Sequence, residues 1–283
     1  MNHTPAPKAA LHAPQQSHNS KTTASGVKQW FKKQGYRFAP WLFFISLLIL
    51  WESICRLGHV PTYILPSPSS IINAFFNVSF SRWMVHLWAT LRVALLGFIV
   101  SILISIPLSI ALIRSELLNR TIYPVLVVIQ STPVVAVAPL IIVLMGTGDA
   151  SRVLITCLIT FFPLVVSTTT GMLETPQELI ELSQSLRAPR YRETWQIRIP
   201  YAIPHIFSGL RVSITLAIIG AVVAEFVAAE QGLGYFIQFS TSFFKIPQAF
   251  AGLVFLSAIS LLLFKSVHWI QAWLFPWSLP KKK

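Results

Sequence analysis

Charged residues are scarce in this sequence. Only 11% of its 283 residues are charged, and nine of them are Asp or Glu, whereas an ordinary soluble domain has about 25%. A composition this poor in charge is typical of a membrane protein, and 283 residues leave no room for a large soluble domain beside about six membrane spans. Cysteine is also rare: Cys55 and Cys157 lie in apolar segments without metal-ligand spacing, so we interpret both as packing thiols.

Catalytic motifs are missing as well. The sequence has no G-x-x-x-x-G-K-[ST] phosphate-binding loop, no G-x-S-x-G elbow and no H-E-x-x-H pair. Its histidines are scattered rather than clustered as metal ligands. The sequence therefore predicts a chain that is not an enzyme, does not itself hydrolyse ATP, and binds neither a metal nor a cofactor.

Apolar residues are abundant, at 54% of the chain. A bilayer core of about 30 Å needs about 20 apolar residues per helix, so runs of this length predict an all-α polytopic membrane protein. We expect one domain over residues 38–275 with six spans, at about 38–56, 88–113, 121–145, 152–172, 206–229 and 249–270.

The distribution of Lys and Arg predicts the orientation of the spans. With the N-terminus inside, fifteen basic residues fall on the cytoplasmic side and four outside, as the positive-inside rule requires. Both termini are then cytoplasmic. The net charge of +13 is explained by span ends and tails facing anionic lipid, so no nucleic-acid partner is expected.

The two ends of the chain are polar. Residues 1–37 have too little apolar surface to fold and predict a disordered, basic cytoplasmic arm. Residues 276–283 end in three lysines and predict a basic cytoplasmic tail. Between the first two spans, a Ser-Pro-Ser-Ser sequence predicts a short interfacial helix over about 70–79, capped by Ser69 or Ser70.

Several prolines fall within the predicted spans, where each removes a backbone donor and can bend or break the helix. They are Pro107, Pro133, Pro139 and Pro163.

The third span carries polar residues at mid-membrane depth, and these make it a candidate wall of a translocation pathway. They are Gln130, Ser131 and Thr132, followed by Pro133. Irregular backbone at this depth is tolerated where it is buried in protein or faces water. Two interpretations stand side by side: the polar residues line the pathway, or Ser131 and Thr132 only satisfy carbonyls freed by Pro133.

Glu225 lies deep within the fifth predicted span. Ionisable groups at such depth are costly and need a partner or a function. Glu225 either pairs with an arginine of another span or lines the route.

The most informative stretch lies between the fourth and fifth spans, at 178–204, where charged residues separate two long apolar runs. Its first part predicts a short amphipathic helix with an apolar stripe that can seat in a partner's groove. The stripe comprises Leu179, Ile180, Leu182 and Leu186. Glu178 and Glu181 lie in the early turns, where carboxylates favour the helix dipole.

This stretch resembles the EAA loop of permease subunits in binding-protein-dependent ABC importers. Glu181-Leu182-Ser183 takes the place of E-A-A, and Ile197-Arg198-Ile199-Pro200 takes the place of I-x-L-P, with the spacing kept. Arg187 stands where the family has glycine, which permits a left-handed turn that a side chain disfavours. The resemblance implies an ATPase-coupling loop at about 174–205, with contact residues Glu178, Glu181, Leu182, Ser183, Leu186, Arg187, Arg190, Ile197, Ile199 and Pro200.

Further stretches extend the resemblance over about 38–275 and narrow it to permeases for nitrate, sulfonates, taurine and related solutes. They include LPSPSSIINAF, QSTPVVAVAPLIIVLMGTGDASR and VVAEFVAAEQGLGYFI. The last two look closest to members for thiamine-precursor or riboflavin-like heterocycles. The resemblance implies the type I importer fold in the bacterial inner membrane, and a small organic or oxyanion solute.

The same resemblance implies the partners. A second permease copy, two ATP-binding subunits that use ATP and Mg, and an extracytoplasmic solute-binding protein would complete the importer. The alternative from another class is an ATP-independent carrier or channel, which would not need a docking loop and would carry more ionisable groups within its spans.

Overall fold

The computed structural model describes residues 22–279, which contain helices and no strand, so the all-α prediction is confirmed. The chain divides into two units, Met1–Ile54 and Cys55–Lys283. The first unit contains most of helix α1 (Thr22–Leu57), whose segment Ala39–Leu57 is long and apolar enough to span a membrane.

Helix α1 differs from the sequence prediction at its start. Residues 1–21 of the predicted disordered arm lie outside the described residues, as do 280–283 of the predicted tail. From Thr22 to Arg37 the structure describes a helix that is continuous with the adjoining span, where the sequence predicted a disordered arm.

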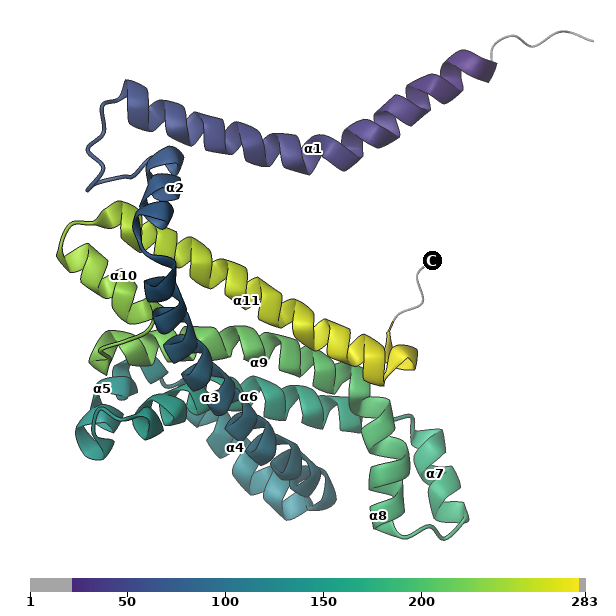
Figure 1. Ribbon diagram of the computed structural model, residues 1–283. Coiled ribbons are helices and arrows are strands. Elements are labelled where there is room, and N and C mark those ends of the chain that lie inside the picture. The colour runs from purple at the N-terminus through teal and green to yellow at the C-terminus, as the bar shows by residue number, and fades with distance from the viewer. Residues whose placement is uncertain (1–21, 280–283) are drawn as a thin grey trace, which may run out of the picture. The chain divides into compact units, whose positions relative to one another are not determined.

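The second unit carries the remaining spans of the described chain. Four single helices qualify by length and composition: α3 (Phe80–Arg114), α6 (Asp149–Leu173), the segment Arg190–Ala228 that ends with α9 (Ile199–Ala228), and α11 (Ile246–Leu274). The pair α4 (Glu116–Ser131) and α5 (Val134–Met145) qualifies as one broken span, bent by 94°. Counted with α1, the described residues hold up to six spans (Figure 1).

The break between α4 and α5 falls at Pro133. Thr132 before it is extended, with φ −76° and ψ 125°, a conformation that the following proline ring favours by disfavouring the helical one. The other span prolines do not interrupt their helices: α3, α5 and α6 run through Pro107, Pro139 and Pro163. Of the two expected effects, a bend or a break, these three prolines cause no break, because adjacent turns of a membrane helix can absorb one missing donor.

Helix α6 packs against both α3 and α9 in the second unit, and α3 and α9 also contact each other. Hydroxyl groups from both neighbours donate to its carbonyls: Ser105 Oγ to Phe161 O at 3.1 Å, Ser109 Oγ to Val165 O at 3.2 Å, and Ser213 Oγ to Thr160 O at 3.0 Å. Small polar residues allow close approach and bind helices to one another in lipid. A hydrophobic core of α3, α9 and α11 residues packs beside them.

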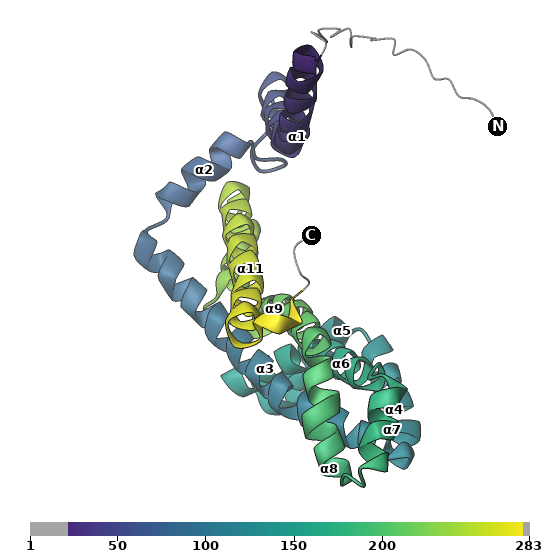
Figure 2. The same ribbon diagram turned by 90° about the vertical axis from the view of Figure 1, so that its right-hand side faces the viewer.

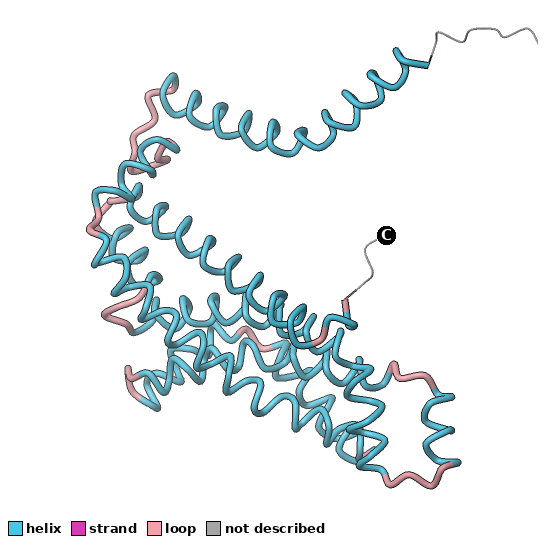
Figure 3. Tube along the Cα trace, turned by 45° about the vertical axis from the view of Figure 1, so that its right-hand side comes forward, coloured by secondary structure: helices cyan, strands magenta, loops and turns pink. Residues whose placement is uncertain are grey.

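Two short helices connect the spans on one side. Helix α2 (Pro68–Asn77) matches the predicted interfacial helix, but it begins earlier, since Ser67 is the N-cap and its Oγ accepts from Ser70 N at 3.3 Å. Proline at the first helical position explains the shift, because its missing N–H costs nothing there. Helix α10 (Leu233–Ser242) precedes α11. Short loops join the successive helices of the second unit (Figure 3).

Candidate functional site

The segment between α6 and α9 forms a hairpin that projects from the end of these two helices (Figure 1 and Figure 2). It consists of α7 (Gln177–Ser185), the single turn α8 (Arg190–Arg192) and a π-helical turn η1 (Glu193–Arg198) that leads into α9. The predicted amphipathic helix is therefore present.

Helix α7 divides the four predicted stripe residues between two faces. Ile180 is buried within the protein, together with Ser183. Leu179, Leu182 and Leu186 stay exposed, the last two at 57% and 73%. Their spacing of three and four places them on one side of the helix. The free apolar stripe is thus narrower than predicted, and Ile180 anchors the helix.

Arg187 adopts the left-handed conformation, with φ 52°. The hydrogen bonds around it are those of a Schellman helix end: Arg187 N donates to Gln184 O at 2.9 Å and Ala188 N to Ser183 O at 3.0 Å. Pro189 follows and prevents the helix from continuing. The position expected to hold glycine therefore keeps the turn that favours glycine, although it carries an arginine.

Arg198, the variable residue of the Ile197-to-Pro200 motif, ties the hairpin to the spans. Its Nε donates to Glu193 Oε1 at 2.8 Å and its Nη1 to Met172 O of α6 at 3.2 Å. Ile197, Ile199 and Pro200 are half-buried beside it. The sequence pattern drew attention to the motif's fixed positions and missed Arg198.

A second contact links the hairpin to α3. Arg114 Nε, in the last turn of α3, donates to Thr194 Oγ1 at 3.4 Å, and Thr194 is buried. The hairpin therefore contacts both α3 and α6, while Glu178, Glu181 and Arg190 remain exposed.

An apolar cavity of about 640 Å³ lies between the broken span, α6 and α9. Gln130, Thr132 and Pro133 line it, as the pathway interpretation expects, and most of the remaining wall is aliphatic or aromatic, including Ile159, Phe162 and Ile219. Pro133 and residues on both sides of the break between α4 and α5 are part of this lining.

Thr132 also supports the second interpretation. Its Oγ1 donates to Val128 O at 3.4 Å, and its N–H donates to Ile129 O, the carbonyl that Pro133 cannot reach, at 3.2 Å. One residue thus satisfies carbonyls at the break and faces the cavity, so the two interpretations are compatible. The side chain of Ser131 lies outside the described residues.

Glu225 is separated from that cavity. It is 1% exposed, and its Oε2 accepts from Gly234 N at 2.7 Å. This hydrogen bond comes from a backbone amide, and the positive charge of Arg152 on α6 also acts on the carboxylate, although no ion pair joins the two among the described residues. Glu225 therefore holds the start of α10 and is not part of the lining that Gln130 and Thr132 share.

Two side chains of α3 complete this cap. Gly232 N donates to His86 Nδ1 at 3.2 Å, and Leu233 N donates to Thr90 Oγ1 at 2.8 Å. The first N–H groups of a helix have no partner within it, so here three buried side chains from two spans supply acceptors. Neither His86 nor Thr90 was singled out by the sequence, because the contact joins residues more than 140 positions apart.

Gly232 is required at this cap. Its φ is 129°, and a Cβ built there would lie 2.2 Å from the Glu225 carboxyl carbon. The glycines of the G-L-G sequence after Glu225 are the signal from which the approach could have been inferred.

The chain belongs to the family described as the binding-protein-dependent transport system inner membrane component, whose model matches residues 101–278. It is thus the permease component of an ABC importer, as the EAA-like pattern indicated, and its relatives fall in the branch to which the further stretches narrowed the resemblance. The matched range contains the hairpin, the apolar cavity and Glu225 of the α10 cap, whereas His86 and Thr90 precede it.

Relatives in this branch are named for different solutes. The chain is 35% identical to the formylaminopyrimidine transport permease protein ThiX of Halalkalibacterium halodurans, over 87% of this chain and 98% of that one. It is 37% identical to the riboflavin transport system permease protein RibX of Chloroflexus aurantiacus, over 82% and 87%. It is 28% identical to the taurine transport system permease protein TauC of Escherichia coli, over 82% and 86%.

The fold resembles a solved importer. The inward-facing MetNI methionine ABC transporter matches with a TM-score of 0.57 and 20% identity, over 65% of this chain and 91% of the matched chain. At this identity the match concerns the fold alone, and it agrees with the predicted type I architecture.

Proposed function

We propose that this chain forms half of the translocation pathway of an ABC importer and that its hairpin couples the pathway to a separate ATPase. The observation that carries the coupling proposal is the exposed stripe Leu179, Leu182 and Leu186 on a helix whose other side is anchored by Ile180. A partner groove that covers these three leucines removes apolar surface from water.

The contacts at the base of the hairpin support force transmission. Arg198 holds the hairpin to α6, and Arg114 holds it to α3. A pull on α7 is then carried to two spans, one of which lines the apolar cavity. Glu181, Arg187 and Arg190 lie in or beside the coupling surface.

In the proposed assembly two copies of the chain pair, two ATP-binding subunits seat the two hairpins, and a solute-binding protein delivers solute from outside. Both termini are cytoplasmic, as the Lys and Arg distribution indicates. Closure of the ATPases on ATP and Mg draws the hairpins together and opens the pathway outward, and hydrolysis returns it to the inward state.

The apolar cavity is the proposed pathway segment of this chain, with Gln130 and Thr132 as its polar positions and Pro133 as the bend that forms it. Its largely apolar wall favours a small organic solute over a bare inorganic oxyanion, because a bare ion would lose hydration there without compensation. The names of ThiX and RibX agree with a heterocyclic solute.

Co-purification with the candidate ATPase tests the coupling proposal. Leu182→Glu places a charge in the stripe, and Gln184→Glu places the same charge on a different exposed side of α7. We expect Leu182→Glu to weaken ATPase association at least tenfold, and Gln184→Glu to leave it within a factor of two. Equal association of both variants with the ATPase, at wild-type level, would contradict the role of the stripe.

A further inference from the structure

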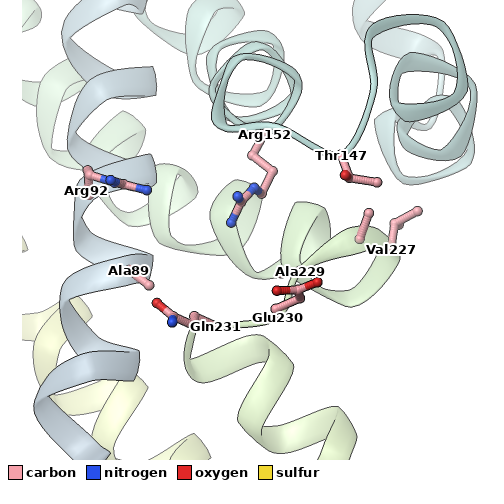
Figure 4. Close-up of a pocket in the computed structure, with 9 residues that line it drawn as sticks. Ala89, Arg92, Thr147, Arg152, Val227, Ala229, Glu230 and Gln231 are labelled. Carbon is pink, nitrogen blue, oxygen red and sulfur yellow. The ribbon is translucent and has the colours of Figure 1, made fainter.

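A second cavity, of about 570 Å³, is polar and lies beside the capped start of α10. Arg92 of α3 and Arg152 of α6 reach it from one side, and Glu230 and Gln231 reach it from the loop between α9 and α10 (Figure 4). Four polar side chains from three segments thus converge on one space.

The two arginines share one carboxylate. Asp149, in the first turn of α6, pairs with Arg92 through Oδ2 and with Arg152 through Oδ1, the latter at 2.8 Å. Asp149 offsets one of the two positive charges, and the buried carboxylate of Glu225 also acts electrostatically on Arg152. The N–H groups of the two guanidinium groups that bind neither Asp149 nor Gly148 can hold an anionic group, which arginine binds through paired hydrogen bonds.

Arg152 is fixed in place and is not a freely moving surface group. Its side chain is 15% exposed, and its Nε donates to Gly148 O at 3.4 Å. Arg92 is 48% exposed and is the more accessible of the two. A ligand therefore meets one guanidinium group held rigidly and one that can adjust.

The opposite wall carries a negative charge. Within the described residues, no ion pair joins Glu230 to either arginine, so its carboxylate is available to a cation or an amine. The loop that bears Glu230 is held by the cap described above, since His86 and Thr90 bind the amides of the residues that follow it. The two oppositely charged walls are therefore kept apart.

The polar cavity continues the face that lines the apolar one. On α9, Val223 lines the apolar cavity, and Val227, one turn later, lines the polar cavity. On α6, Ile159 lines the first and Arg152, two turns earlier, lines the second. In the proposed orientation the polar cavity is the outer end of the pathway.

We propose that this polar cavity binds a small solute with an acidic group at one end and an amino group at the other. Arg92 and Arg152 hold the acidic group, and Glu230 holds the amino group. The proposal rests on the proposed function only in treating the ligand as a transported solute, because the site itself lies within one copy of the chain.

Three small probes of matched size test the site on the permease alone in lipid nanodiscs, without ATPase or binding protein. They are β-alanine, propionate and propylamine, and their binding is measured by saturation-transfer NMR. We expect β-alanine to bind about tenfold more tightly than either of the other two, because only β-alanine engages both walls. Equal binding of all three would overturn the proposal.

Two variants test which side of the polar cavity binds which group of the solute. Arg92→Gln is expected to weaken β-alanine binding about tenfold, while Glu230→Gln abolishes the preference for β-alanine over propionate. Thermal melts show that each variant is folded. A wild-type preference that both variants retain would overturn the assignment.

The result does not depend on the coupling proposal, which is tested by ATPase association. If no probe binds and Arg92→Gln instead weakens association of the loaded binding protein, the arginines belong to protein docking and the solute site is refuted.

Discussion

Replacement of Arg187 by glycine is expected to stabilise the protein. A side chain in the left-handed region costs on the order of 1–2 kcal/mol, and Arg187 has φ 52°. Glycine removes this cost, but it also has more conformational freedom in the unfolded chain, and this lowers the stability of the folded state by about 0.5–1 kcal/mol. Among the described residues the Arg187 side chain has no hydrogen bond or ion pair to lose. The net gain is therefore on the order of 0.5–1 kcal/mol.

Thermal unfolding in detergent, followed by tryptophan fluorescence, measures this gain. A change of this size raises the melting temperature by about 2 °C for a domain of this length. Arg187→Ala distinguishes the effect of the backbone conformation from that of the guanidinium group, since alanine removes the charge but keeps the strain. This variant should leave the melting temperature almost unchanged. Ser185→Gly, in the last turn of helix α7, should lower it. The reasoning is refuted if Arg187→Gly destabilises the protein as Ser185→Gly does.

Three further predictions concern the cap and the cavity. Gly232→Ala should lower the free energy of unfolding, measured by heat or denaturant, by more than about 2 kcal/mol, because its Cβ meets the Glu225 carboxylate. Gly148→Ala is the control: it has open space around it and should lower the same free energy by less than about 0.5 kcal/mol. Thr90→Val leaves Leu233 N unpaired and should cost about 1–3 kcal/mol in the same assay, against a smaller effect of Glu225→Gln, whose amide oxygen can still accept from Gly234. Ile219→Trp, on the apolar cavity, should reduce solute uptake by proteoliposomes containing the complete importer at least tenfold, whereas Leu253→Trp, equally exposed at 49% but on α11, should not; equal uptake by the two variants would remove Ile219 from the pathway.

The membrane class and most span positions could be predicted because they depend on local composition. Runs of apolar residues predicted the spans directly. Pro133 indicated the break between α4 and α5, since a proline constrains its own backbone and that of the preceding Thr132. The continuous helices through Pro107, Pro139 and Pro163 could not be foreseen from a single proline rule, because neighbouring turns and helices decide whether the missing donor matters.

The candidate sites were only partly accessible to the sequence. The hairpin between α6 and α9 followed from charge and spacing, and its proposed coupling role from the resemblance, but the burial of Ile180 depends on the body of the protein against which α7 packs. The partner of Glu225 was missed because it is a backbone amide, and amides carry no residue-type signal. The two arginines of the polar cavity, from α3 and α6, are brought together by helix packing alone.

Solute-stimulated ATP hydrolysis tests the central claim most directly. The chain is reconstituted in lipid with its candidate ATPase and solute-binding protein, as wild type, Leu182→Glu and Gln184→Glu. The account predicts that the loaded binding protein stimulates hydrolysis by wild type and Gln184→Glu, and that Leu182→Glu abolishes the stimulation. Equal stimulation in all three would contradict coupling through the α7 stripe, and solute uptake without any ATP hydrolysis would identify an ATP-independent carrier.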